Sequence, residues 1–355
     1  MEPAGRPTVV KVLVTGARSL LGRATVEQLL AQGDEVTVLQ RHEAGLPCVE
    51  VLADIADADA VARAAYGQDA VLHLAAKVDV TGRWAEFART NIDGTRAVLA
   101  ACRSAGVPRL VHVSTPSVAH HGRALMGVGA GPADPARVRG HYARSKAVAE
   151  REALAADGAD LAVVAVRPHL VWGPGDTQLV TRIVERARAR RLVLVGSGAA
   201  LIDTTYVDNA AGALVAALAA CRRVHGEALV VSNGEPRPVA EVVGRICSAA
   251  GVPGPRGRLP LPAAWLAGGL VEGLWGLTGA STTPPVTRFL ATQLATAHWF
   301  DQRHTRSALA WRPEITLGEG FNRLAAWYGA SPAESAESAE SAESAESAES
   351  AESAQ

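Results

Sequence analysis

The sequence predicts an α/β protein: a doubly wound parallel sheet with helices on both faces, followed by a smaller C-terminal region. Three observations predict it. Short β-branched runs alternate with longer helical patterns through residues 9–171, a glycine-containing turn follows the first run, and the alternation loosens after Trp172. Short apolar runs are typical of buried parallel strands, and strand–helix alternation indicates βαβ units.

The elements of this sheet follow in chain order. We expect buried strands over residues 9–14, 35–39, 70–74, 110–113 and 161–166, and residues 49–52 and 228–232 are strand-like as well. Residues 22–32 and 90–105 carry apolar side chains at helical spacing, and Gly33 and Gly106 follow them as turn residues. These segments supply the strands and two of the helices of the doubly wound fold.

Domain organisation follows from the place where this pattern weakens. We expect residues 1–171, completed by segments within about 201–235, to form the larger domain, and residues 172–200 and 236–330 to form the smaller one. Residues 333–353 repeat Ala-Glu-Ser seven times. Because the repeat has no apolar residue larger than alanine, we expect a disordered solubilising tail over 331–355 in preference to a docking tail.

The charge and cysteine content narrow the class of protein. Without the seven glutamates of the tail, 35 basic residues stand against 29 acidic ones, spread along the chain without a basic block, so nucleic acid is not an expected partner. The four cysteines have no metal-binding spacing, and we expect them reduced and no metal to be bound. They are Cys48, Cys102, Cys221 and Cys247.

The apolar segments predict a cytoplasmic protein. The N-terminus lacks the apolar run of a signal peptide, and no apolar stretch reaches the 18 or so residues of a membrane span. The nearest candidate, residues 262–277, is short and contains Glu272. Core packing, one wall of an acyl tunnel and a contact with a membrane surface all remain open for this segment.

A turn typical of dinucleotide binding follows the first strand. Gly16 permits a tight turn, Gly22 allows the helix to pack close to the strand, and the N-terminus of the helix offers free amides to a pyrophosphate. Ser19 replaces the usual middle glycine, which narrows the room for the phosphates. The candidate cofactor-binding residues of this Rossmann-type turn are Gly16, Arg18, Ser19, Leu20, Leu21 and Gly22.

The end of the second strand bears on the type of cofactor. An NAD site places an acid there to bind the ribose hydroxyl, whereas this chain has Gln40 and Arg41, with Arg18 in the glycine turn. Guanidinium groups without a carboxylate favour a 2′-phosphate, so we expect NADP(H) in preference to NAD(H); alternatively, Arg41 is a solvated loop residue. Asp54 either lies near the adenine or caps a helix.

Side chains later in the chain form a candidate set for proton transfer. Tyr142 and Lys146 stand four positions apart on a predicted helix and so share one face. A nearby ammonium should stabilise the phenolate and lower the pKa of the tyrosine. Ser114 and Thr115 end the strand before this helix, where a hydroxyl can bind the same substrate oxygen.

Together these motifs resemble the extended short-chain dehydrogenases/reductases, in the branch of 3β-hydroxysteroid dehydrogenases and sugar-nucleotide epimerases. The resemblance covers residues 9 to about 328. It implies that Thr115 is the catalytic hydroxyl residue, Tyr142 the acid/base and Lys146 its partner. The matching positions beside the cofactor are Ala75 and Ala76 of His-Leu-Ala-Ala, and Pro168 after Arg167 with the Gly-Pro-Gly-Asp loop at 173–176. Asn91 matches the family's helix asparagine, and residues 206–209 match a Tyr-Val-Asp-Asn stretch of this branch.

Several longer sequence segments are similar to those of the bacterial 2-alkyl-3-oxoalkanoate reductases of long-chain olefin biosynthesis. They span residues 114–118, 167–180, 203–211, 232–236 and 284–300. The resemblance implies that NADPH delivers a hydride to the ketone of a β-keto acid while Tyr142 protonates the oxygen and Thr115 orients the carbonyl. Lys146 would hold the nicotinamide ribose and lower the pKa of the tyrosine.

A β-keto acid also requires a cation for its carboxylate. Lys77, directly after the His-Leu-Ala-Ala strand end, is our candidate, and His169, Arg182 and Arg288 compete with it. The Gly/Pro-rich stretch 119–140 separates Thr115 from Tyr142, so we expect it to border the substrate. His120 and His121 in this stretch are interpreted as loop residues.

Three alternative functions remain open. A 3β-hydroxysteroid or sterol-4-carboxylate 3-dehydrogenase would share the catalytic set but use NAD. A sugar-nucleotide epimerase would require a polar nucleotide pocket, which the Leu/Trp/Ala-rich C-terminal region disfavours. A non-catalytic NAD(P)-binding sensor or scaffold is disfavoured by the intact catalytic set. A homodimer and a complex with neighbouring biosynthetic enzymes are both open, and the sequence does not give the oligomeric state.

Overall fold

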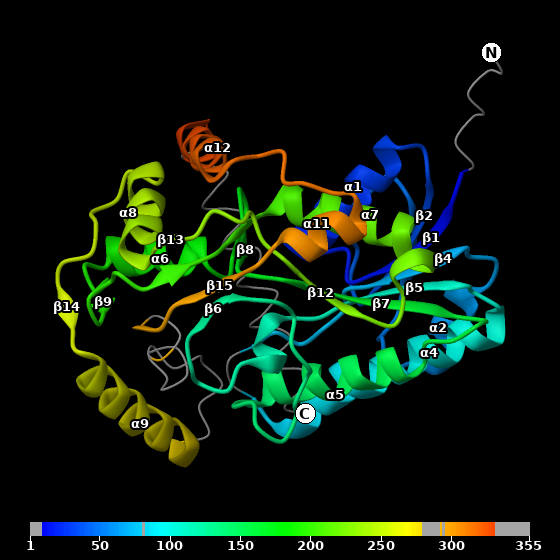
Figure 1. The fold of residues 1–355 in the computed structure, drawn as a ribbon, viewed down its shortest axis with the longest axis horizontal. Coiled ribbons are helices and arrows are strands. Elements are labelled where there is room, and N and C mark those ends of the chain that lie inside the picture. Colours follow the sequence, from blue (N-terminus) through cyan, green and yellow to red (C-terminus); the bar gives the residue numbers. More distant parts are fainter. Residues whose placement is uncertain (1–8, 80–81, 279–291, 293–294, 331–355) are drawn as a thin grey trace.

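A seven-stranded parallel sheet forms the centre of the molecule in the computed structural model, which describes residues 9–79, 82–278, 292 and 295–330 (Figure 1). Its strand order is β12-β7-β5-β4-β1-β2-β3, and all six pairings are parallel. The strands are β1 (Lys11–Thr15), β2 (Glu35–Gln40), β3 (Val49–Leu52), β4 (Ala70–His73), β5 (Arg109–Val113), β7 (Ala162–Pro168) and β12 (Ala228–Val231). The doubly wound fold class predicted from the sequence is confirmed.

Helices cover both faces of this sheet, because each buried strand is apolar on both sides. Figure 1 shows α1 (Leu20–Ala31), α7 (Val207–Val224) and α11 (Arg303–Leu309) on one face. On the other face lie α2 (Ala58–Ala65), α4 (Gly94–Ala105) and α5 (His141–Ala155). Alternation along β1 shows the two layers: Val12 and Val14 pack toward α1 and α7, whereas Leu13 packs toward α2 and α4.

The segment expected as one helix over residues 90–105 is divided. The observed helical run begins earlier, with α3 (Trp84–Phe87), continues as a π-helix over Ala88–Asp93 and becomes α-helical again in α4. Asn91 lies in the π-helical part, where its side chain bonds to the backbone of Lys77 and to Ser145 of α5. Such single π-turns occur often where a helix must present one side chain to a site.

The C-terminal half adds small sheets and helices beyond the end of the central sheet. A four-stranded sheet has the order β13-β10-β15-β6, and two short ribbons pair β11 with β8 and β14 with β9. The strands are β6 (Leu125–Val128), β8 (Val171–Trp172), β9 (Leu194–Val195), β10 (Leu201–Ile202), β11 (Thr205–Tyr206), β13 (Arg237–Pro238), β14 (Arg258–Leu259) and β15 (His298–Phe300). The helices are α6 (Val180–Arg188), α8 (Val239–Ala249), α9 (Leu261–Thr278) and α12 (Leu317–Ala330), and a 3₁₀ turn covers Pro116–Ala119.

Residues 119–140, expected as a loop, therefore contain a strand. β6 pairs with β15, and residues 125 and 298 are neighbours in that pairing. The partner lies more than 170 positions away in the chain, so no local pattern in the sequence could indicate it.

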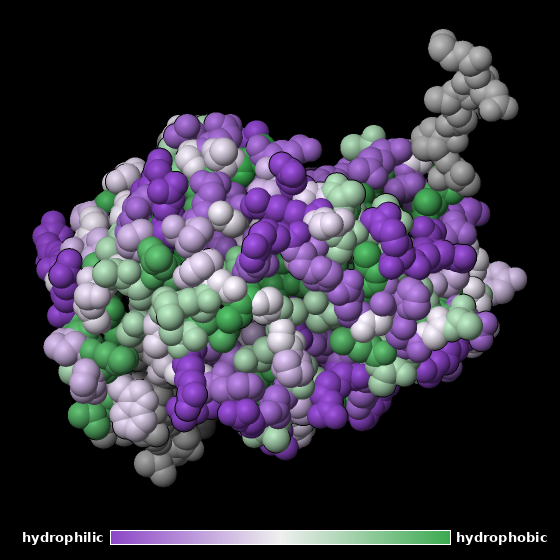
Figure 2. Space-filling view, in the orientation of Figure 1, coloured by the Kyte–Doolittle hydropathy of each residue, from purple (hydrophilic) through white to green (hydrophobic). Residues whose placement is uncertain are grey.

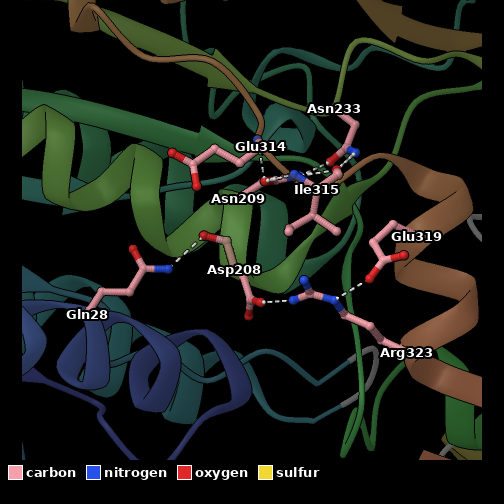
Figure 3. Close-up of polar contacts among 8 residues, drawn as sticks. All are labelled: Gln28, Asp208, Asn209, Asn233, Glu314, Ile315, Glu319 and Arg323. Carbon is pink, nitrogen blue, oxygen red and sulfur yellow. Dashed lines mark hydrogen bonds and ion pairs between the residues drawn. The ribbon is translucent and has the colours of Figure 1, made fainter. Parts of the chain in front are cut away.

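Two asparagines hold the C-terminal part of the chain against the sheet (Figure 3). Asn209, at the start of α7, accepts hydrogen bonds from the amides of Glu314 and Ile315 and donates one to the carbonyl of Ile315 at 2.6 Å. Asn233 donates to the same carbonyl at 2.8 Å. Arg323 of α12 bridges Asp208 and its own helix. The Tyr-Val-Asp-Asn stretch thus holds residues 314–323 in place.

Candidate active site

The glycine turn after β1 is packed too closely for larger residues. Gly16 has φ +77°, and a Cβ added there would lie 2.8 Å from the backbone of Ala75 at the end of β4. A Cβ on Gly22 would lie 2.3 Å from the carbonyl oxygen of Gly16. Both positions therefore require glycine, which brings the backbone of the turn close to that of β4.

Ser19, the departure from the glycine pattern, caps the following helix. Its φ of −66° and ψ of 156° are extended, so glycine is not required there. Its hydroxyl accepts a hydrogen bond from the amide of Gly22 at 3.0 Å and donates one to the carbonyl of Gly16. Among the described residues, nothing accepts from the amides of Leu20 and Leu21. Free amides at a helix N-terminus suit a phosphate, so this turn fits a dinucleotide.

Glu50, an acid of β3 beside the end of β2, is already engaged. The carboxylate of Glu50 accepts hydrogen bonds from the amides of Ala44 and Leu46 and from the side chain of Gln40, and these bonds lower its pKa. Glu50 therefore holds the loop that follows β2. Arg41 in that loop and Arg18 in the glycine turn are both exposed.

Asp54 does not cap a helix. The cap of α2 is Asp57, whose side chain accepts from the amide of Ala60. Asp54 instead closes a turn through the amide of Ala56 and pairs with Arg89 at 3.1 Å. It lies at the carboxyl edge of the sheet, beside the π-helix.

A buried histidine joins the ends of β1 and β4. Thr95 donates to the carbonyl of Asn91, so it accepts from Nε2 of His73 at 3.0 Å. The opposite nitrogen, Nδ1, then accepts from the hydroxyl of Thr15 at 2.8 Å, and that hydroxyl accepts from the amide of Ala75. Burial, assisted by the charge of Lys146, lowers the pKa of His73 to about 3, so the ring is neutral. This chain fixes the backbone beneath Gly16.

Thr115 and Tyr142 meet where β5 ends. Thr115 caps the 3₁₀ turn over Pro116–Ala119, and its hydroxyl lies 2.9 Å from that of Ser117. Burial raises the pKa of Tyr142 to about 12, and a hydrogen bond with the Thr115 hydroxyl lowers it in part. The pKa of this phenol is thus raised, contrary to the lowering expected from the sequence, because the desolvation of the phenolate outweighs its polar contacts.

Lys146 and its surroundings carry buried charges. The ammonium donates to the carbonyl of Val113 at 2.7 Å, which fixes it at the end of β5. Burial lowers its pKa from 10.5 to about 8, although the carboxylate of Glu150 opposes the shift. Glu150 in turn pairs with Arg167 at 2.7 Å, and both side chains are only 1% exposed. Asn91 connects this helix to the end of β4 through Ser145 at 2.9 Å.

The candidates for a substrate carboxylate lie in different places. Lys77 contacts Asp79 at 2.6 Å and Glu86 at 3.4 Å, so two carboxylates already neutralise it. His169 is buried beside His298 and Phe300, and burial holds its pKa well below the usual range, so it carries no charge near neutral pH. Arg182 lies on α6 in the C-terminal half, and Arg288 falls outside the described residues. The structure therefore disfavours Lys77 and His169 for this role.

Three residues of this region were not singled out from the sequence. Ser117 contacts the Thr115 hydroxyl, Glu150 lies between Lys146 and Arg167, and Thr95 completes the bonds of His73. Glu150 follows Lys146 by four positions, a spacing at which opposite charges meet on a helix. Ser117 follows Thr115 by two positions in the same turn, whereas the contact of Thr95 with His73 joins α4 to β4 and leaves no local signal.

Comparison with known proteins adds to this geometry. Residues 12–232 match the model of the NAD dependent epimerase/dehydratase family. A protein of Stenotrophomonas maltophilia named 2-alkyl-3-oxoalkanoate reductase is 41% identical over 89% of this chain and 99% of its own. One of Shewanella oneidensis with the same name is 35% identical over 90% and 86%.

More distant relatives carry other names. A 3 beta-hydroxysteroid dehydrogenase/Delta 5-->4-isomerase of Mycobacterium tuberculosis is 34% identical over 71% of this chain and 73% of its own. Among solved structures, MoeE5 in complex with UDP-glucuronic acid and NAD has a TM-score of 0.68 at 26% identity, covering 90% of this chain and 99% of that one. The chain therefore belongs to the NAD dependent epimerase/dehydratase family, the extended short-chain dehydrogenases/reductases, and is an oxidoreductase.

Proposed function

We propose that this protein reduces a 2-alkyl-3-oxoalkanoate, a long-chain β-keto acid, to the 2-alkyl-3-hydroxyalkanoate with NADPH. The observation that carries the proposal is the full-length similarity to two proteins named for this reaction, together with the meeting of Thr115, Tyr142 and Lys146 at one strand end. Such a step belongs to the metabolism of long-chain lipids, and we place it in olefin biosynthesis.

In this proposal Tyr142 is the proton donor. A phenol whose pKa is about 12 keeps its proton near neutral pH, as a donor to a developing alkoxide must. Thr115 orients the ketone oxygen, and its bond with Ser117 limits the rotation of its hydroxyl. Lys146, fixed by the carbonyl of Val113, supplies the adjacent positive charge. The bound nicotinamide would supply the hydride.

The cofactor would lie along the carboxyl edge of the sheet. The residues proposed to hold it are Gly16, Arg18, Ser19, Leu20, Leu21, Gly22, Arg41, Asp54, Ala75, Ala76, Tyr142, Lys146 and Pro168. NADPH is favoured over NADH because Glu50 is engaged by its own loop while Arg18 and Arg41 are exposed. Replacing Arg41 by Ala should raise the KM for NADPH about tenfold and leave that for NADH unchanged. The matched control is Arg63→Ala, an exposed arginine of α2.

The deciding assay follows nicotinamide absorbance with the purified protein. NADPH and NADH are each offered with a long-chain 2-alkyl-3-keto acid, and NADP⁺ with the stable 2-alkyl-3-hydroxy acid, because keto acids of this kind decarboxylate. Turnover with NADP(H) supports the proposal. Activity only with NAD⁺ and a 3β-hydroxysterol would instead favour the sterol dehydrogenase, the second candidate that the relatives support.

A lipophilic substrate bears on where the enzyme acts and on what it contacts. We propose a cytoplasmic protein whose segments 172–200 and 236–330 receive the substrate, and which meets a membrane surface through residues 262–277. None of the described helices combines the length and apolar character needed to cross a bilayer. A homodimer or a complex with neighbouring enzymes would allow direct transfer of an unstable keto acid.

A further inference from the structure

The pairing of β9 with β14 brings an arginine-rich segment beside a second segment that adds two more arginines. Residues 186–200 and 251–271 contain six arginines and no Asp or Glu. They are Arg186, Arg188, Arg190, Arg191, Arg256 and Arg258. Arg258 lies opposite Leu194 in the ribbon, and the amide of Arg256 donates to the carbonyl of Leu192 at 3.0 Å. The ribbon of β9 and β14 lies at one end of the molecule (Figure 1), so two groups of arginines that are far apart in the sequence meet there.

These arginines share one end of the molecule, where the pairing of β9 with β14 brings their segments together. Arg190, Arg191, Arg256 and Arg258 are all exposed, and none forms an ion pair with a carboxylate of the described residues. Some exposed arginines elsewhere do find such partners, as Arg96 does with Glu152 at 2.7 Å, and others, such as Arg63 and Arg103, stand singly without one in the described part of the chain. Four like charges that no ion pair within the described residues neutralises repel one another and attract an anionic partner.

An apolar surface continues directly from the ribbon. α9 begins just after β14; Ala264 on its inner side is buried against Val195 and Leu259. On its outer side Leu266 is 62% exposed and Trp265 is 38% exposed. In Figure 2 hydrophilic side chains mark the end of the molecule where β14 lies, and hydrophobic ones follow toward α9.

We propose that this surface docks on a bilayer of anionic phospholipids. The arginine surface, defined as Arg190, Arg191, Arg256 and Arg258, contacts the headgroups, and Trp265 with Leu266 enters the interface beside them. Basic residues beside exposed tryptophan and leucine suit the boundary between headgroups and acyl chains. The inference deepens the proposed function, because a long-chain keto acid partitions into the bilayer from which the enzyme would receive it.

The test is co-sedimentation of the full-length protein with vesicles. Vesicles of phosphatidylcholine alone are compared with vesicles of equal parts phosphatidylcholine and phosphatidylglycerol. Each arginine near an anionic surface contributes roughly fivefold to binding, so R256Q/R258Q should weaken it roughly 25-fold. The matched control R63Q/R103Q removes two exposed arginines from α2 and α4 and should bind like the parent. Leu266→Ser should weaken binding without changing its dependence on salt.

The outcomes separate this inference from the proposed function. Equal binding to both kinds of vesicle, no binding to either, or equal loss in R63Q/R103Q would overturn the docking surface. Tighter binding to soluble polyglutamate than to anionic vesicles would also overturn it and assign the arginines to an acidic protein segment. Ketone reduction is measured in parallel with a short, water-soluble β-keto substrate. If the parent protein does not reduce this substrate, the result counts against the proposed reductase function and leaves the docking surface to be judged by vesicle binding. If R256Q/R258Q reduces it as fast as the parent does, the variant is folded.

Discussion

The end of β5 and the β9–β14 ribbon use positive charge in opposite ways. At the end of β5, Lys146 is 2% exposed and donates to a backbone carbonyl, and Arg167 forms a buried pair with Glu150. In the ribbon, Arg256 and Arg258 are exposed and meet no carboxylate among the described residues. A buried charge requires a hydrogen-bonding or oppositely charged partner within the chain, whereas an exposed charge is solvated by water and requires none. The comparison separates charges that serve the fold and the chemistry from charges that, we propose, bind an anionic membrane surface.

The largest effect on activity should come from replacing Tyr142, the proposed proton donor at the end of β5. Tyr142→Phe removes the proton donor and should lower kcat about 10³-fold, within the range for a positioned acid. Dinucleotide binding, measured by fluorescence titration, should persist, because the phosphate-binding turn is untouched. Tyr66→Phe serves as the matched control, since that tyrosine is 82% exposed. Retained turnover in the Tyr142 variant would remove the phenol from the mechanism.

A buried partner should be costly to remove. Glu150→Gln leaves the guanidinium of Arg167 buried without its counter-charge and should destabilise the protein by about 3 kcal/mol or more in urea unfolding. Glu152 lies on the same helix as Glu150 and forms a more exposed pair with Arg96 of α4. Glu152→Gln breaks this pair and should lower the free energy of unfolding by less than about 1 kcal/mol. Similar losses for the two variants would contradict the distinction between buried and exposed pairs.

The buried lysine should also govern the dependence of activity on pH. Its pKa is lowered from 10.5 to about 8 by burial, so the reductive kcat should fall as pH rises through 8 and the ammonium loses its proton. The unfolded chain binds this proton up to a higher pH than the folded one, so the contribution of Lys146 to stability rises between about pH 8 and 10.5. Lys146→Arg should move the limb of the activity profile to higher pH; an unmoved limb would assign it to another group.

The smallest effect is expected at the ribbon. R256Q/R258Q should change the free energy of unfolding by less than about 0.5 kcal/mol, because neither side chain has a carboxylate partner within the described residues. Urea unfolding of this variant beside the parent measures it. A loss comparable with that of Glu150→Gln would show that these arginines belong to the fold.

Local patterns predicted the parts of the molecule that depend on local chemistry. The strand–helix alternation gave the parallel sheet, because runs such as residues 9–14 must be buried on both faces. The Tyr142 and Lys146 spacing placed both on α5. The raised pKa of Tyr142 could not be foreseen, since it depends on burial by elements distant in the chain. The strand β6, the acids beside Lys77 and the convergence of Arg191 with Arg256 likewise arise from tertiary contacts.

The asparagine contacts at Glu314 and Ile315 bear on the order in which the chain is completed during synthesis. Asn209 and Asn233 leave the ribosome long before the backbone groups that satisfy them. The N-terminal part of a chain folds first as it emerges. The side-chain amides of Asn209 and Asn233 therefore lack these hydrogen-bond partners until residues 314–315 have been synthesised. A chain truncated before residue 314 would therefore leave polar side chains without hydrogen-bond partners beside α7. We expect cellular proteases to degrade such an incompletely folded chain.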